Sequence, residues 1–276
     1  MQPRTIMAVV NEQADMDRVL ACAEPLAERF SAHLLAIHAG ALPMPAASPM
    51  GFPDTGIIQA SIEASRDRAE LLRAAIESRR AAVKAEWQSF IGFASEAERF
   101  VARAARASDL VVTQQANPDA NSPAVGAEEL LFETGRPVLF VPYAGKVDPR
   151  FRKAVLAWNG TAEAARAAFD AMHFLVEADS VSILCVDPRA SEGEAAEYTG
   201  TDIAEALSRH GAKVSIFNEP SAGLRPGEAI ENHLAQTGAD LLVMGAFSQS
   251  WLRQFFFGGA TRILLRSMPV ATLMSR

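Results

Sequence analysis

The segment at 243–261 carries the clearest potential chemistry in the chain, with the sequence VMGAFSQSWLRQFFFGGAT. Gly245 stands at the end of an apolar run of strand length, and Gly258 and Gly259 stand just before a helical pattern. Backbone without a Cβ lets a ligand approach closely, and the free N–H groups at a helix start attract anions. The spacing predicts an anion-binding loop. A strand-end turn with a close helix–sheet contact would need the same glycines, so both interpretations stay open.

Other chemistry has little support in the sequence. The five histidines are scattered, and Cys22 and Cys185 lie in different halves of the chain, so no metal-ligand spacing arises. There is no Gly-x-Ser-x-Gly elbow and no Walker lysine loop, and only Arg253 and Arg262 supply cations near the glycine loop. We expect no catalytic residue and no metal, and enzymatic activity is the weaker alternative.

The composition is that of an ordinary globular protein. The chain has 276 residues, 49% of them hydrophobic and 21% charged, and a formal net charge of −7. A negative surface repels phosphate backbones and anionic headgroups, so we expect no nucleic acid and no membrane partner. The first residues do not have the order of a signal peptide, and scarce cysteines suit a reducing compartment. We therefore expect a cytoplasmic protein.

The elements that would position the loop follow from an internal repeat. Three segments occur twice with matching patterns, namely 4–11 with 152–159, 107–112 with 239–244, and 136–141 with 268–273. The offsets leave an excess in the first half, which we place mainly at 39–56 and expect to be a surface loop. The repeat predicts two domains, 1–143 and 151–276, joined by a polar linker at 143–150.

Within each half, apolar runs alternate with helical patterns. In the second half the predicted strands are 153–158, 180–186, 212–217, 241–245 and 270–274, and the predicted helices are 162–175, 203–210, 228–237 and 259–267. Continuous apolar runs are typical of parallel strands covered on both faces. The sequence therefore predicts an α/β fold of two tandem doubly wound, open, parallel five-stranded sheets.

In such a fold, ligands bind beyond the carboxyl ends of the strands, where the strand order reverses. The positions to inspect in the second half are Asn159, Gly160 and Thr161 after the first strand, Asp187 and Pro188 after the second, and the segment from Gly245 to Gly259 after the fourth, which Met244 precedes.

The glycine loop resembles the signature of the universal stress protein family, G-x2-G-x9-G-[ST], followed by a helix and a terminal Pro-Val strand. Gly245 and Gly258 match its first and third glycines. Ser248 replaces the second glycine and Gly259 replaces the Ser/Thr, with Thr261 two residues further on. The resemblance covers both halves and is strongest in the last 40 residues.

The resemblance implies a fold of the adenine nucleotide alpha hydrolase type and a ligand such as ATP or AMP. By position, Asn159 stands for an Asp that contacts adenosine, and Val186 offers backbone to adenine. The role of holding ribose and phosphates falls to a loop set formed by Gly245, Ser248, Gly258, Gly259 and Thr261. Asn159 lacks the carboxylate charge, and Ser248 would be strained if a positive φ is needed there. Trp251 and the phenylalanines at 255–257 are expected to pack over the sheet edge rather than to stack on a base.

The first half lacks these features. Its loop after the fourth strand contains Pro118 and Pro123, which have no N–H donor, and no glycine pair. Asn11 again replaces the Asp and is followed by Glu12, which would repel phosphate. We expect a degenerate N-terminal domain beside a nucleotide-binding C-terminal one, in a stress-response regulatory protein. The alternative is a stress-response interaction protein that binds no nucleotide and acts as a dimeric scaffold, a homodimer formed through edge strands.

Overall fold

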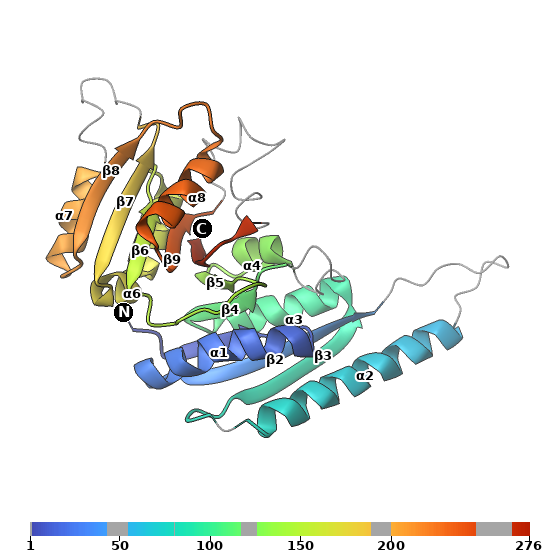
Figure 1. Cartoon of the computed structure of the whole chain (residues 1–276). Coiled ribbons are helices and arrows are strands. Elements are labelled where there is room, and N and C mark those ends of the chain that lie inside the picture. Colours follow the sequence, from blue (N-terminus) through green and yellow to red (C-terminus); the bar gives the residue numbers. More distant parts are fainter. Residues whose placement is uncertain (1, 43–54, 80, 117–125, 189–199, 247–266) are drawn as a thin grey trace. The chain divides into compact units, whose positions relative to one another are not determined.

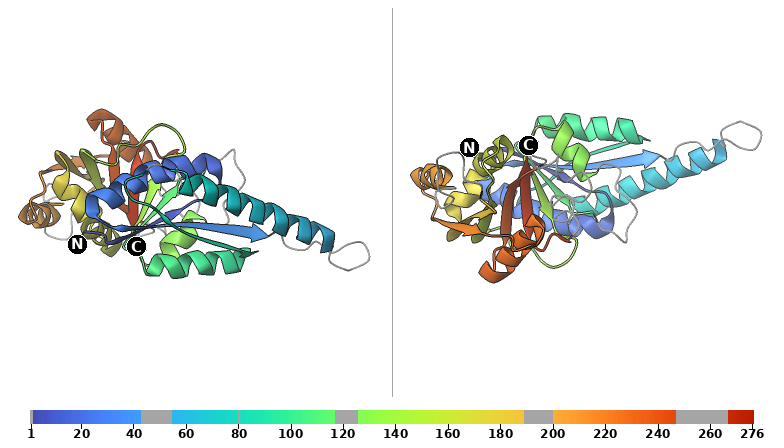
Figure 2. Two further views of the ribbon diagram at one scale, coloured as in Figure 1. Left: turned by 90° about the horizontal axis from the view of Figure 1, so that it is seen from below. Right: turned by 90° about the horizontal axis from the view of Figure 1, so that it is seen from above.

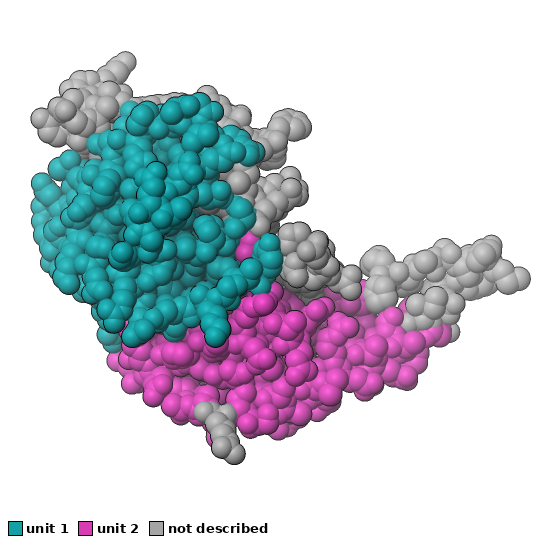
Figure 3. Space-filling model, viewed as in Figure 1, with its two compact units in different colours: residues 1–2, 135–276 teal, residues 3–134 magenta. Residues whose placement is uncertain are grey.

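The structure is a computed structural model that describes residues 2–42, 55–79, 81–116, 126–188, 200–246 and 267–276. The chain divides into two compact units (Figure 3). The N-terminal unit is Pro3–Thr134, and the C-terminal unit is Gly135–Arg276 with Met1–Gln2. None of the described helices combines the length and the apolar character needed to cross a membrane.

The N-terminal unit is a parallel sheet in the strand order β3-β2-β1-β4 (Figure 1). Its strands are β1 (Thr5–Val9), β2 (His33–Leu42), β3 (Glu86–Phe93) and β4 (Leu110–Gln114), and its helices are α1 (Gln13–Phe30), α2 (Thr55–Glu77), α3 (Ala94–Arg106) and α4 (Ala127–Glu133). Helices α1 and α2 cover one face of this sheet, and α3 and α4 the other (Figure 2). This division is what right-handed crossovers require when the strand order reverses after β3.

The C-terminal unit repeats this order and adds two strands. Its sheet runs β5-β10-β9-β6-β7-β8. The strands are β5 (Val138–Val141), β6 (Lys153–Ala157), β7 (Ser180–Val186), β8 (Val214–Glu219), β9 (Leu241–Gly245) and β10 (Ala271–Ser275), and the helices are α5 (Ala162–Asp170), α6 (Met172–Glu177), α7 (Thr201–Arg209) and α8 (Pro226–Thr237). All neighbouring pairs within this sheet are parallel except β5 with β10, which is antiparallel.

The predicted α/β class and doubly wound strand order are confirmed. The fifth strand of the first repeat is β5, and it pairs with the last strand of the second repeat, with Leu139 opposite Leu273. The segment 143–150 contains no helix or strand. The domain limits 1–143 and 151–276 stay a prediction.

The same side-chain contact also recurs at the start of the first strand in both repeats. Asp109 Oδ2 accepts hydrogen bonds from the N–H groups of Arg4 (2.8 Å) and Thr5 (3.0 Å). In the second repeat the Asp240 carboxylate accepts from the N–H groups of Arg152 (2.9 Å) and Lys153 (3.0 Å). In both units, the residue before the fourth strand therefore fixes the entry of the first strand.

Several helix and strand limits differ from the sequence prediction by one or two residues, and two differences concern whole elements. The predicted helix at 162–175 is divided into α5 and α6, with Ala171 between them. The third strand runs two residues later than predicted, because Gly211 turns with a φ of 94° and the N–H of Ala212 still bonds back to Leu207. The predicted helix at 259–267 falls almost wholly outside the described residues.

Candidate functional site

The carboxyl ends of β6, β7 and β9 lie at one edge of the C-terminal sheet. Ala157 is level with Leu184 of β7 on one side and with Met244 of β9 on the other. The chain beyond these positions leads directly to Asn159, Val186 and Gly245. The structure therefore brings together the predicted site residues that it describes, at the point where the strand order reverses between β6 and β9.

Gly245 is where α5 crosses closest to the sheet. A Cβ built on Gly245 would lie 2.5 Å from the backbone N of Ala164 and 2.6 Å from the backbone C of Glu163. Real Cβ atoms do not approach backbone this closely, so only glycine fits here without a shift of the helix. Of the two interpretations of this glycine, the close helix–sheet contact is thus present in the structure. Its contact with a ligand stays a prediction.

The loop after β6 turns directly into α5. Asn159 Oδ1 accepts from the hydroxyl (2.8 Å) and the N–H (3.3 Å) of Thr161, and Thr161 Oγ1 accepts from the N–H of Ala164 (3.3 Å). Thr161 is therefore the N-cap of α5, and Asn159 holds the cap. Gly160 has a φ of 72°, and a Cβ on it would meet nothing within 4 Å, so the space beside this turn is open among the described residues.

The start of α5 leaves backbone donors uncovered. Within the described part of the chain, the N–H groups of Ala162 and Glu163 have no hydrogen-bond partner, because neither has a carbonyl four residues back inside the helix. The positive end of the helix dipole adds to the attraction of these groups for negative charge. The first turn also contains the Glu163 side chain, which acts in the opposite direction.

The end of β7 is held by the neighbouring strand. Val186 is level with Glu219 of β8, and the N–H of Asp187 donates to the Glu219 carbonyl (2.9 Å). Asp187 adopts a left-handed φ of 47°, and its Oδ1 accepts from the N–H of Ser221 (2.8 Å). Hydrogen bonds from the Ser221 hydroxyl and N–H lower the pKa of Asp187, so an exposed carboxylate stays ionised at this edge.

Ser275 is a polar residue at this edge that sequence reasoning missed. It is level with Gly245, and its carbonyl accepts from the N–H of Ala246 (2.8 Å). Its side chain is 1% exposed, and its Oγ has no hydrogen-bond partner among the described residues. Register partners in a parallel pair point to the same face, so Ser275 lies on the face covered by α5. Only the strand register could have placed it beside Gly245.

Four of the predicted loop residues lie outside the described residues, namely Ser248, Gly258, Gly259 and Thr261. The same applies to Trp251 and to the phenylalanines at 255–257. The roles assigned to all of them stay predictions.

Comparison with known proteins decides the family of the second repeat. Residues 150–276 match the model of the Universal stress protein family. These residues belong to that family. The resemblance found in the glycine loop is therefore confirmed at the level of the family.

Solved structures extend the likeness in fold to the first repeat. A universal stress protein from Archaeoglobus fulgidus DSM 4304 covers 100% of this chain and 97% of its own, with a TM-score of 0.72 at 15% identity. A putative universal stress protein from Pseudomonas aeruginosa UCBPP-PA14 covers 99% and 93%, with a TM-score of 0.58 at 15% identity. At these identities the likeness concerns the fold. A search of curated protein sequences gave no match.

The first repeat carries different polar side chains at the equivalent strand ends. Asp15, 6% exposed, accepts from the N–H groups of Glu12 (2.8 Å) and Asn11 (3.3 Å), which caps the start of α1. Burial raises the pKa of Asp15. Gln114 stands in β4 where Gly245 stands in β9, and the side-chain oxygens of Gln114 and Asn11 are buried with no partner among the described residues.

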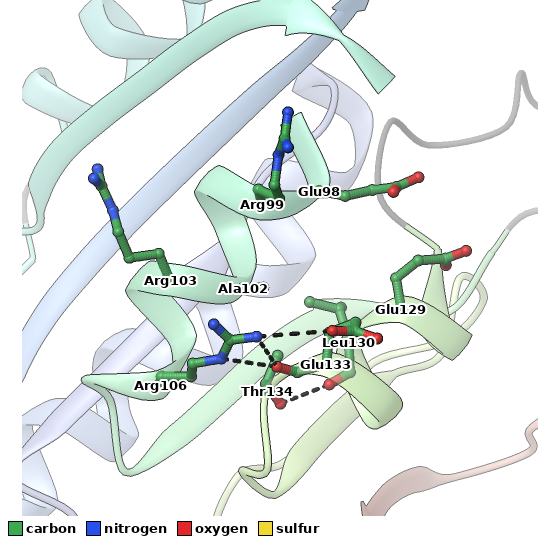
Figure 4. A pocket seen from close by; sticks show the side chains of 9 residues that line it. All are labelled: Glu98, Arg99, Ala102, Arg103, Arg106, Glu129, Leu130, Glu133 and Thr134. Atoms are coloured by element: carbon green, nitrogen blue, oxygen red, sulfur yellow. Dashed lines mark hydrogen bonds and ion pairs between the residues drawn. The ribbon is translucent and has the colours of Figure 1, made fainter. Parts of the chain in front are cut away.

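A hollow in the N-terminal unit lies away from these strand ends. It has a volume of about 440 Å³ and lies between α3 and α4 (Figure 4). Three arginines and three glutamates line it, and the guanidinium of Arg106 donates to the Glu133 carbonyl (2.8 and 3.0 Å). The charges balance, and none of the predicted site residues is there. No group of three His, Cys, Asp or Glu side chains able to hold a metal occurs in the described ranges.

Proposed function

We propose that this chain is a stress-response regulatory protein that binds an adenine nucleotide, ATP or AMP, at the carboxyl edge of its C-terminal unit. The observation that carries the proposal is the start of α5, where the N–H groups of Ala162 and Glu163 have no partner among the described residues, beside the turn at Gly160. The family membership of residues 150–276 adds the expectation that this edge is the ligand edge.

In this proposal, Asn159 contacts the adenosine and the backbone of Val186 contacts adenine. The loop set of Gly245, Ser248, Gly258, Gly259 and Thr261 holds the ribose and phosphates, and Met244 forms the floor. In this proposal the N-terminal unit binds no nucleotide, because the Asp15 carboxylate takes up the N–H groups of Asn11 and Glu12 in the turn before α1 and adds a negative charge there.

We also place the protein in the cytoplasm. Neither Cys22 nor Cys185 is in a disulfide, and burial raises their pKa values to about 12 and about 11. Thiols protonated in this way are poor nucleophiles and give no sign of a disulfide role.

The experiment is a thermal unfolding series of the full chain with ATP, AMP and GTP. At a hundredfold excess over Kd, a ligand of the folded state adds about 2.7 kcal/mol of stability and raises Tm. Gly258→Val should abolish the shift by filling the space for phosphate. A Tm that no adenine nucleotide moves, in protein purified without bound nucleotide, contradicts the proposal.

A matched pair of variants tests the adenosine contact. Asn159→Asp keeps the acceptor that caps α5 and restores the charge that the family uses, so we expect tighter adenine nucleotide binding. Asn11→Asp makes the same change at the equivalent position of the first repeat and should leave binding unchanged. An equal effect of both substitutions would contradict the assignment to the C-terminal edge.

A second function is favoured by the same asparagine. Asn159 Oδ1 already accepts hydrogen bonds from Thr161, so this side chain also stabilises the turn that begins α5. A scaffold that binds no nucleotide would show the silent thermal series described above and would still self-associate. The thermal series separates the two functions, because only the nucleotide-binding protein would show a rise in Tm, whereas self-association is compatible with both.

A further inference from the structure

Strand β8 forms the outer edge of the C-terminal sheet, and its exposure is unusual for a strand in this protein. Four of its six residues are exposed, whereas all five residues of β10 are buried. The outer side of β10 is covered by β5. No described strand pairs with the outer side of β8.

The hydrogen bonds to β7 show which backbone groups of β8 point outward. The Lys213 carbonyl accepts from Val181 (2.9 Å), and the Glu219 carbonyl accepts from Asp187 (2.9 Å). In a parallel pair, alternate residues of a strand direct both N–H and C=O to the same neighbour. Positions 213, 215, 217 and 219 therefore face β7, and the backbone groups of Val214 and Ile216 face outward.

The side chains of the edge are apolar at its centre and charged at its ends. Ile216 is 36% exposed and Phe217 is 37% exposed, and they lie on opposite faces of the strand. Lys213 precedes the strand and is exposed, and Glu219 ends it. No proline or glycine interrupts the strand. Edge strands usually carry such interruptions or central charges, which keep other strands from pairing with them.

We propose that β8 pairs antiparallel with β8 of a second copy of this chain, around a twofold axis at Ile216. In this register the outward backbone groups of Ile216 in the two copies bond to each other. Lys213 of each copy lies opposite Glu219 of the other, so two cross-strand ion pairs form. Ile216 packs against its own equivalent, and Phe217 lies opposite Ser215 of the second copy.

The charges select this register and this partner. A shift by two residues in either direction removes both Lys213–Glu219 pairs and shortens the overlap. Glu219 is held in place because its Oε1 bonds Nδ1 of the buried His233 (2.7 Å), which leaves its Oε2 for the second copy. The exposed edge of the N-terminal unit, β3, has Glu86 as its only charged residue, so self-pairing there gains no ion pair. The pairing does not depend on nucleotide binding.

The test is sedimentation velocity of the full chain over a range of concentrations. The wild type is expected to form a dimer. Lys213→Glu replaces two favourable pairs with two repulsive ones and should raise the dimer dissociation constant about tenfold or more. Lys84→Glu makes the same charge change just before β3 and is the matched control, so its dimer should be unchanged.

A second variant tests the backbone pairing. Ile216→Pro removes an N–H that β7 does not use, so circular dichroism should stay native while the dimer is lost. A monomeric wild type at every concentration overturns the proposal. It is equally overturned if Lys213→Glu dimerises like the wild type, or if Lys84→Glu weakens the dimer as much. Should Ile216→Pro not fold, the two lysine variants decide alone.

Discussion

At the scale of single residues, the two repeats differ in the side chains placed at their strand ends. Gly245 lets α5 lie against β9, whereas Gln114 puts a buried amide in the same position of the first repeat. Gly160 leaves an open turn where Glu12 is part of a capping box. Among the described residues, small side chains thus occupy these positions of the C-terminal edge, and larger polar ones occupy the equivalent positions of the N-terminal edge.

Gly245→Ala should destabilise the protein through overpacking. The added methyl would meet the backbone of α5 at 2.5 Å, and backbone cannot rotate away as a flexible side chain does. We expect a loss of about 1–3 kcal/mol in the free energy of unfolding, measured by urea titration. Gly40→Ala is the control, since its Cβ would meet its nearest atom, Cγ1 of Ile91, at 3.4 Å. Equal losses for both variants would argue against the close contact.

Asp15→Asn should change how stability depends on pH. Burial raises the pKa of Asp15 above its ordinary 3.8, so the folded state holds this proton more tightly than the unfolded state. The resulting stabilisation is complete below pH 3.8 and is lost as pH rises through the folded pKa. The stability of the wild type relative to Asp15→Asn should therefore fall with rising pH, as measured by urea titrations across this range.

Asp187→Asn is the matched case of opposite sign. Hydrogen bonds from Ser221 lower the pKa of Asp187, so its stabilisation is present above pH 3.8 and lost as pH falls through the folded pKa. The wild type should gain stability relative to Asp187→Asn as pH rises. The same slope for both variants would show that burial and hydrogen bonding do not act as described.

At the scale of elements, the start of the first strand in each repeat is fixed by an aspartate that is distant from it in the sequence. Asp109 and Asp240 each receive two N–H groups from a strand more than 80 residues earlier in the chain. These bonds anchor the first strand of each sheet beside the fourth, next to the reversal of strand order.

Asp240→Ala should loosen the start of β6. Two backbone donors, at Arg152 and Lys153, lose a charged acceptor but remain within reach of water, so we expect a loss of about 1 kcal/mol. Asp109→Ala should cost a similar amount, because it makes the same two bonds in the first repeat. Amide hydrogen exchange locates the effect: each variant should speed exchange at the first residues of its own strand.

The fold could be predicted from sequence because the strands of the second repeat are mostly apolar runs, and the runs recur with helices between them. The start of β8 could not, because it depends on the left-handed turn at Gly211 and on the bond from the N–H of Ala212 back to the carbonyl of Leu207. The places after strands predict Asn159 and Gly245, and the resemblance to the family adds Val186; their contact with a ligand stays a prediction. Ser275 and Asp15 were missed, since register and burial reveal them and motif spacing does not.

At the scale of the whole molecule, the last strand of each repeat determines which edges remain free. Strand β5 comes from the first repeat and β10 from the second, and they pair with each other in the C-terminal unit. These two strands therefore cover an edge of each other within one chain, and the outer side of β8 has no partner strand among the described residues.

Removal of β5 should create a new associating edge. A fragment of residues 144–276 leaves the outer side of β10 bare, and β10 is apolar along most of its length. We expect it to form larger assemblies than a fragment of residues 135–276, which keeps β5. Light scattering after size exclusion compares the two masses. Identical masses would show that β5 does not protect this edge.

The pairing of β5 with β10 also has a consequence for control by protein abundance. If the two repeats were separate polypeptides, their association would follow mass action, and the complex would dissociate at low protein concentration. Because a single backbone carries both strands, each meets the other at an effective concentration that expression level cannot alter. The contact between β5 and β10 is therefore independent of protein concentration. Any response of this protein to its own concentration has to depend on another surface of the molecule.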